Sequence, residues 1–123
     1  MSDPAFVYDP DLDGDADPGE VVWTWVPYVE DASQGKDRPV VVIGRDGDDV
    51  LIVPLSSKDH TERPDARDWV ALGSGAWDRD GRTSYADVAR VLKVKANSIR
   101  REGAVLERGR FDAVAAAVRA RTE

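Results

Sequence analysis

Three side chains in the middle of the chain have the chemistry to act on a phosphate ester. Arg38 carries a permanently charged guanidinium that can hold phosphate oxygens through two parallel hydrogen bonds. The hydroxyl of Ser56 can hydrogen-bond a phosphate oxygen, and His60, the single histidine, is the natural acid or base near neutral pH. Each also has an ordinary interpretation: an arginine in a surface salt bridge, a serine in a turn after Pro54, and a histidine in a polar loop. Residue type alone leaves both interpretations open.

Further polar and basic residues flank these three in sequence. The polar segment from Ser56 to Arg67 predicts a long loop, and a loop of this length inside a compact domain is often functional. Its side chains, together with Lys36, have the charge to follow a nucleic-acid backbone, although ordinary solvated loop charges explain them equally well. The residues of this set are Lys36, Ser57, Lys58, Arg63 and Arg67.

Short strands must position these residues. Runs of β-branched and aromatic residues, closed by Pro27 and Pro54 in two cases, predict the strands. The dipeptide Asp46-Gly47 predicts a tight hairpin, and residues 78–81 predict another turn. The predicted strands cover residues 21–26, 39–43, 50–53, 69–72 and, as one last strand, 85–95.

The C-terminal part predicts helical structure. Ser98 is expected to cap a short helical turn that Gly103 ends. A longer helix follows, because apolar residues recur at the spacing i, i+3, i+4 and i+7. About five short strands followed by a helix predict a mainly β fold, a small barrel with the helix packed against it. The stripe of that helix is Phe111, Val114, Ala115 and Val118.

Two tryptophans, Trp23 and Trp25, fall on one face of the first predicted strand. A tryptophan pair at this spacing in a small barrel is usually part of the core, and we expect that here. If the rings are exposed instead, they offer flat surfaces on which nucleic-acid bases can stack.

Length and composition limit the class of protein. A chain of 123 residues, 41% of them hydrophobic, is enough for one domain with one core. The absence of cysteine excludes disulfides, zinc–thiolate sites and a cysteine nucleophile, and it suits a reducing cytoplasm. The sequence shows no leader pattern and no apolar run near the about 18 residues of a membrane span. The protein is therefore expected to be cytoplasmic and free of membranes.

The charge is unevenly distributed. The net charge of −7 argues against nucleic-acid binding at first sight. However, residues 1–20 hold seven acids and no lysine or arginine, which leaves 17 acids and 17 bases in the other 103 residues. The pattern predicts an acidic, flexible arm over residues 1–19 and a folded domain over residues 20–123. A neutral domain can still contain a local basic groove.

The acidic segment also matches a calcium-loop pattern. Asp9, Asp11 and Asp13, followed by Gly14 and then Glu20, occupy the ligand and glycine positions of an EF-hand loop. The context differs from that of an EF-hand, because no helix precedes the loop and a strand follows it. A helix-free calcium loop therefore stands as an alternative to the simple acidic arm.

Three segments and the C-terminal part of the chain resemble the MazF/PemK toxins of type II toxin–antitoxin systems. Residues 18–23 (Pro-Gly-Glu-Val-Val-Trp) are similar to the family's opening strand, and residues 35–43 contain its Gly-x-x-Arg-Pro-apolar pattern. Residues 53–57 (Val-Pro-Leu-Ser-Ser) are similar to its Val-Pro-apolar-Thr/Ser-Thr/Ser loop entrance. Residues 103–106 before the last helix fit as well. The resemblance covers roughly residues 18–120.

The resemblance implies an SH3-like β-barrel and an endoribonuclease that cleaves single-stranded RNA without a metal or cofactor. It also implies a homodimer and a cognate antitoxin peptide as partner. The family's critical arginine corresponds to Arg38 and its critical loop threonine to Ser56. This serine is a departure, since it keeps the hydroxyl but lacks the methyl group that restricts the rotamer. Arg38 would stabilise the phosphorane, with Ser56 on a phosphate oxygen and His60 as candidate acid or base.

Two alternatives come from other functional classes. A catalytically silent barrel of the same fold would bind nucleic acid or a partner protein, and the serine at position 56 and the neutral domain both favour it. A calcium-responsive module would use the acidic segment instead.

Overall fold

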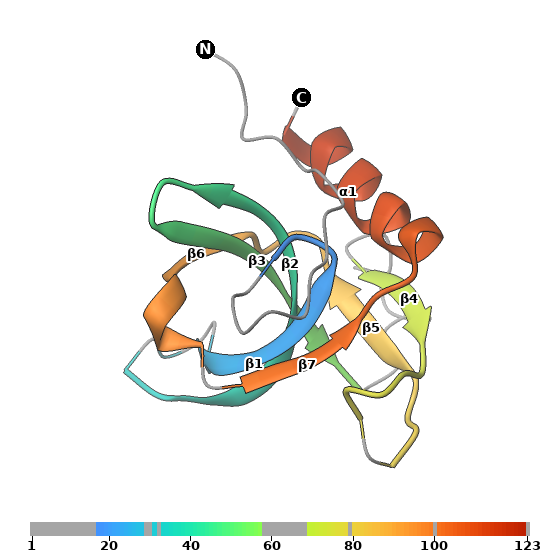
Figure 1. The fold of residues 1–123 in the computed structure, drawn as a ribbon, viewed down its shortest axis with the longest axis horizontal. Helices are drawn as coiled ribbons and strands as arrows, with labels where there is room; N and C mark the ends of the chain where they lie inside the picture. The colour runs from blue at the N-terminus through green and yellow to red at the C-terminus, as the bar shows by residue number, and fades with distance from the viewer. Residues whose placement is uncertain are drawn as a thin grey trace.

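The computed structural model describes residues 17–28, 31, 33–57, 69–78, 80–99 and 101–122. In these ranges the chain forms seven strands, a 3₁₀ turn and one α-helix. Figure 1 shows the strands curled into a small, partly open barrel, with the C-terminal helix lying beside β4. The predicted mainly β barrel with a C-terminal helix is confirmed. The elements are β1 (Glu20–Pro27), β2 (Gly35–Asp46), β3 (Asp49–Ser56), β4 (Trp69–Gly73), β5 (Ser84–Asp87), β6 (Leu92–Lys95), η2 (Ala96–Ser98), β7 (Arg101–Val105) and α1 (Arg108–Thr122).

The sheet is built around β3. The strand order is β4-β5-β3-β2-β1-β7, with β6 also paired to β3, and every described pair is antiparallel. The first half of β3 pairs with both β2 and β6, whereas its last two residues, Leu55 and Ser56, pair with β5. The strand therefore continues past Pro54, where the sequence predicted an end. Proline is tolerated there because β3 passes from one ladder to another at this point.

The predicted hairpin at Asp46-Gly47 is confirmed. Asp46 of β2 pairs with Asp49 of β3, and Gly47 between them has a φ of 64°. A positive φ is easily adopted by glycine, because it lacks a Cβ. This tight turn fixes the register of β2 against β3 and so places both ends of the ladder.

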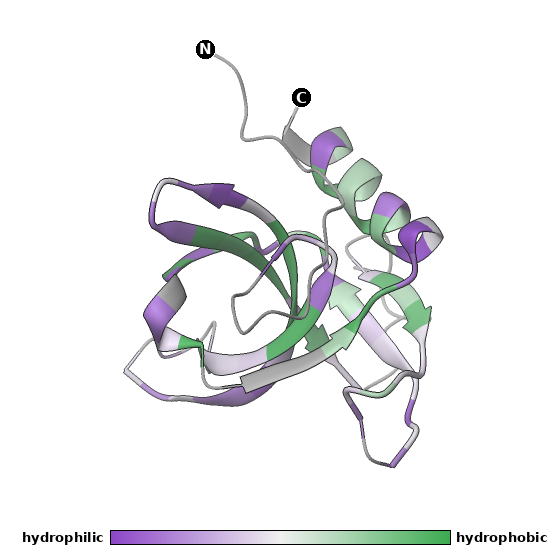
Figure 2. Ribbon diagram, in the orientation of Figure 1, coloured by the Kyte–Doolittle hydropathy of each residue, from purple (hydrophilic) through white to green (hydrophobic). Residues whose placement is uncertain are grey.

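Side chains alternate between two apolar cores. One lies inside the curled sheet and contains Val22, Val26, Val40, Val42, Val50 and Ile52. The other lies between the sheet and α1, where the predicted stripe of Phe111, Val114, Ala115 and Val118 is buried against strand residues such as Val21 and Val41. Figure 2 shows hydrophobic colour along the middle of β3, mixed colour on the helix and hydrophilic colour at the tip of the β2–β3 hairpin.

The segment predicted as one strand over residues 85–95 is two strands, so that expectation was wrong. A turn separates β5 from β6. The Asp87 carboxylate accepts a hydrogen bond from the backbone N–H of Ala89 at 3.2 Å, and its carbonyl accepts one from Arg90 N–H at 3.1 Å. An aspartate that binds the backbone two residues ahead redirects the chain in this way.

The expectation for Ser98 and Gly103 was also wrong. Ser98 ends the 3₁₀ turn η2, and its hydroxyl donates to Lys95 O at 2.7 Å. Gly103 belongs to β7 and lies where the β1–β7 register shifts, between the pairs Val21–Ala104 and Val22–Glu102. Glycine is common at such a bulge. Residues 101–105 form backbone hydrogen bonds with the edge of β1 and so extend the sheet, instead of continuing the helical turn.

The start of the described chain is joined to the barrel. Gly19 N donates to Val42 O at 2.9 Å, and Gly19 O accepts from Leu106 N at 2.8 Å. Pro18 and Gly19 are buried. Gly19 therefore bonds to β2 and to the chain after β7, and Pro18 is buried beside it, although the sequence suggested that both belong to the acidic arm.

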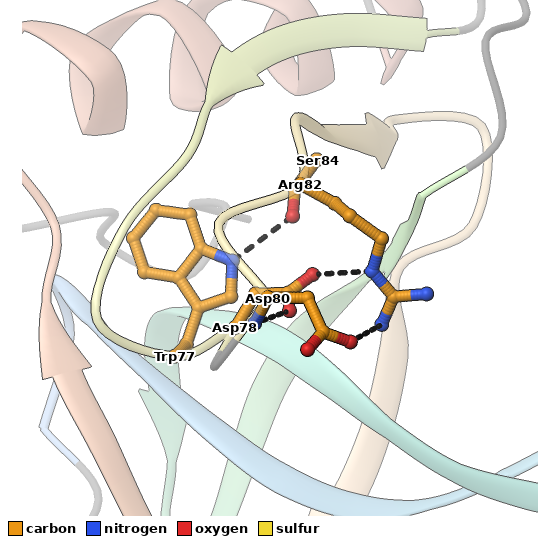
Figure 3. Close-up of polar contacts among 5 residues, drawn as sticks. All are labelled: Trp77, Asp78, Asp80, Arg82 and Ser84. Carbon is orange, nitrogen blue, oxygen red and sulfur yellow. Dashed lines mark hydrogen bonds and ion pairs between the residues drawn. The ribbon is translucent and has the colours of Figure 1, made fainter.

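The connection from β4 to β5 is held by polar side chains (Figure 3). Trp77 is buried, and its Nε1 donates to the Ser84 hydroxyl at 2.9 Å. The Asp78 carboxylate accepts hydrogen bonds from Asp80 N–H at 2.9 Å and from Arg82 Nε at 3.0 Å. The Asp80 N–H, and after it Arg82, lower the pKa of Asp78, so this carboxylate is charged at neutral pH. The predicted turn at residues 78–81 is confirmed, since Gly81 N donates to Asp78 O at 3.0 Å.

Candidate active site

The β1–β2 ladder places Arg38 opposite Thr24. The sequence placed Arg38 just before a strand, but β2 already begins at Gly35, so Arg38 lies within it. Directly paired residues share one face of a sheet. Alternation along β2 puts Arg38 on the face of Val40, which belongs to the core inside the barrel. The side chain is therefore partly buried at the end of that core.

The guanidinium of Arg38 is incompletely satisfied. Its Nε is buried and has no hydrogen-bond partner among the residues that the structure describes. The hydroxyl of the neighbouring Thr24 donates to Ser98 O at 3.4 Å and makes no hydrogen bond with Arg38 Nε. Leaving a buried donor unpaired costs about 1–3 kcal/mol, and more for a charged group. Such a donor at the edge of a core is placed to receive an anionic acceptor.

Ser56 extends from the same end of the neighbouring ladder. The last pair between β2 and β3 is Val40–Pro54. Arg38 precedes Val40 by two residues and Ser56 follows Pro54 by two, so strand alternation places both side chains on the face inside the barrel. Ser56 is held by its pairing with Tyr85 of β5. The predicted Arg38 and Ser56 thus emerge from adjacent strands at one end of the barrel.

Basic residues at this end lack acidic partners. Lys36, opposite Val26 on β1, is exposed, and neither Lys36 nor Arg38 forms an ion pair with any described residue. At the opposite end of β2 and β3, three basic side chains each form an ion pair with an aspartate. These pairs are Arg45–Asp17, Lys93–Asp46 at 2.6 Å and Lys95–Asp49 at 3.9 Å. The local field at the Arg38 end is more positive than the net charge suggests.

Of the remaining predicted site residues, only Ser57 lies in the part of the chain that the structure describes. Ser57 follows β3 and is exposed. The other four lie outside the described residues, so their roles, including that of an acid or base, stay predictions: Lys58, His60, Arg63 and Arg67.

Metal binding finds no support in the described part of the chain. No three His, Asp or Glu side chains cluster there in a way that would hold a metal ion. Of the calcium-loop pattern, Asp9, Asp11, Asp13 and Gly14 lie outside the described residues, whereas Glu20 is fully buried and its Oε1 accepts a hydrogen bond from Asp17 N at 3.3 Å. The residue expected at the last ligand position is thus part of the barrel interior.

Two features of the site were not anticipated from sequence. Thr24 carried no signal, because only the register of β1 and β2 brings it opposite Arg38. Trp25 was expected in the core, and that expectation was wrong, since its side chain is 42% exposed while Trp23 is half-buried. The last pair between β1 and β7 is at Trp23, so β1 projects beyond its partner at Trp25.

Comparison with solved structures gives the same fold. An endoribonuclease in complex with its cognate antitoxin, from Mycobacterial species, has a TM-score of 0.62 at 15% identity and covers 84% of this chain and 90% of its own. MazE–MazF from Deinococcus radiodurans has a TM-score of 0.62 at 14% identity, over 86% and 94% of the two chains. The toxin MazF-mt6 from Mycobacterium tuberculosis has a TM-score of 0.56 at 14% identity, over 80% and 91%. A search of curated protein sequences finds no match.

These structures share with this chain a small, mainly β barrel fold. The sequence profile of the PemK-like, MazF-like toxins of type II toxin–antitoxin systems matches residues 17–121. The chain belongs to this family. No helix in the described part is both long and apolar enough to cross a membrane.

Proposed function

We propose that this toxin is an endoribonuclease that cleaves single-stranded RNA without a metal ion. The observation that carries the proposal is the buried, unpartnered Nε of Arg38, on the same barrel face as Ser56. Arg38 and Lys36 form no ion pair with any described residue, so a phosphate would not have to displace a bound carboxylate from either of them. Family membership supports the same function, and solved structures of this fold are described as endoribonucleases.

The proposed reaction requires two proton transfers and the stabilisation of charge on the phosphorane. The ribose 2′-oxygen loses its proton and forms a bond to phosphorus, and the bond from phosphorus to the 5′-oxygen breaks as that oxygen gains a proton. Arg38 stabilises the charge that develops on the phosphorane oxygens, and Ser56 donates a hydrogen bond to one of them. His60 is the candidate for one proton transfer. The products are a 2′,3′-cyclic phosphate and a free 5′-hydroxyl.

The partners follow from the same family. Two of the solved structures are toxins bound to an antitoxin. We infer a cognate antitoxin peptide for this chain, a C₂ homodimer, which is the commonest kind of oligomer, and action in the cytoplasm, where messenger RNA is available.

The decisive experiment is incubation of the full chain with a long RNA in EDTA, followed by mapping of the new ends. Cleavage that persists in EDTA and leaves cyclic phosphates supports the proposal. An absolute requirement for Mg²⁺ would exclude the mechanism. Binding of RNA or of a partner peptide with no cleavage under any condition would instead identify a silent barrel.

A further inference from the structure

A second arginine, Arg90, reaches the end of β1 from the chain between β5 and β6. Its Nη2 donates to Pro27 O at 3.0 Å, and its backbone N–H donates to Asp87 O at 3.1 Å. The partly buried side chain is thus fixed both at its base and at its tip. Sequence analysis did not single out this residue, because the segment was interpreted as part of one continuous strand.

The contact with Pro27 places the Arg90 guanidinium near the site of Arg38. Pro27 pairs with Gly35 at the end of the ladder in which Thr24 pairs with Arg38. Three residues of strand separate Thr24 from Pro27, a distance of about 10 Å. This spacing along the strand suits two phosphates of one RNA strand, each contacting one of the two arginines.

The charge of Arg90 is not neutralised by the described part of the protein. Arg90 forms no ion pair there, and the hydrogen bond to Pro27 O uses only one of its five N–H donors. Arg90 shares this lack of an ion pair with Arg38, whereas four other described arginines each have a carboxylate partner. They are Arg45 with Asp17, Arg82 with Asp78, Arg108 with Asp112 and Arg110 with Glu107.

We propose that Arg90 binds an RNA phosphate that flanks the one contacted by Arg38. The inference rests on the proposed function. Arg90 is held rigidly by Pro27 and Asp87, so it binds this phosphate without first having to be ordered. Lys36, opposite Val26, lies between Thr24 and Pro27 along the ladder and extends the same line of positive charge. The strand of RNA is thereby held at two points.

The test measures RNA affinity against salt concentration. A 2′-fluoro oligonucleotide serves as the probe, because it lacks the nucleophilic hydroxyl and cannot be cleaved. Losing one phosphate contact reduces the slope of log K against log salt by about 0.7 for single strands. Arg90→Gln should show that reduction, and Arg90→Lys should keep the slope of the wild type. Arg108→Gln, which removes a charge from the exposed start of α1, is the matched control and should also keep it.

Kinetics with cleavable RNA provide the second readout. A flanking phosphate is bound equally in the ground state and the transition state, so Arg90→Gln should raise KM and leave kcat near that of the wild type. Weaker binding with an unchanged salt slope would show that Arg90 only braces β1, and would overturn the inference. If the wild type cleaves RNA but Arg90→Gln has the same salt slope and KM, the inference about Arg90 is wrong and the proposed endoribonuclease function stands. If the wild type neither binds nor cleaves RNA, the proposed function fails.

Discussion

Thr24 and Arg38 face each other across β1 and β2, and they differ in how their polar atoms are satisfied. Thr24 donates to Ser98 O and so ties β1 to the turn that precedes β7, while Arg38 Nε has no partner in the described structure. Within the described residues, Arg38 Nε can therefore bind an anionic acceptor without breaking a hydrogen bond.

Replacement of Arg38 should remove activity and spare the fold. Arg38→Ala should lower the cleavage rate by about 10²-fold or more, as for the loss of other donors that stabilise a transition state. Arg38→Lys should recover only part of the rate, because lysine keeps the charge and loses the planar fork. Initial rates on a defined RNA measure both. Arg45→Ala, at the other end of β2, is the control and should cleave normally; equal rates for Arg38→Ala and wild type would remove Arg38 from the mechanism.

Ser56 should act through its hydroxyl. Ser56→Ala is expected to impair cleavage strongly, whereas Ser56→Thr keeps the hydroxyl, restricts its rotamer and should match or exceed the wild-type rate. Ser74→Ala, an exposed serine between β4 and β5, is the matched control in the same assay. If Ser56→Ala cleaves as fast as Ser74→Ala, Ser56 is only a strand residue. If His60→Ala loses most of the cleavage rate while Ser56→Ala is unaffected, the essential side chain is the histidine.

A side chain at position 35 should distort the end of the site. A Cβ at Gly35 would lie 2.3 Å from Val26 O and 2.7 Å from Trp25 Cζ2. The strands must separate to accept it, so Gly35→Ala should reduce the free energy of unfolding by about 1–3 kcal/mol, which thermal or urea denaturation can measure. Gly109→Ala in α1 meets nothing within 4 Å and should be neutral or slightly stabilising. Equal stability of the two variants would contradict the close packing at Gly35.

Removal of one partner of the hydrogen bond between Trp77 and Ser84 should lower the free energy of unfolding. Ser84→Ala leaves the buried indole N–H without its acceptor, which costs about 1–3 kcal/mol in urea denaturation. Trp77→Phe removes the donor as well as some volume. In the double variant, the loss should therefore be smaller than the sum of the two single losses. Strict additivity would mean that the hydrogen bond contributes nothing to stability.

The assembly should be a dimer. We expect a mass of about twice 13.5 kDa in light scattering. A mass of one chain that does not change with protein concentration would contradict the homodimer.

Local patterns predicted the elements that depend on local chemistry. The turn at Gly47 and the helix stripe from Phe111 to Val118 follow from glycine conformation and from helical periodicity, and both are present. β7 could not be found in this way, because residues 101–105 carry no alternating apolar pattern. They form a strand because the edge of β1 is available to them. The start of β2 was missed for a similar reason: Lys36, Asp37 and Arg38 are charged and conceal the strand.

The site residues likewise divide into those that the sequence could predict and those that depend on long-range pairing. Arg38 and Ser56 were singled out by residue type and family resemblance, and the ladders do bring them to one end of the barrel. Thr24 and Arg90 depend on pairings between distant segments, which a single sequence does not reveal. The 63-residue separation between Arg90 and Pro27 illustrates why.

The pairing of β1 with β7 also has a consequence for the time at which the toxin becomes complete during translation. Glu20 pairs with Val105, so one edge of β1 has no partner until residues 101–105 have been synthesised. The hairpins from β1 to β3 can form as they leave the ribosome, since their contacts are local, whereas the ladder between β1 and β7 joins residues about 80 positions apart. The first three strands can therefore form an open sheet during translation, and the barrel closes only after β7 has left the ribosome.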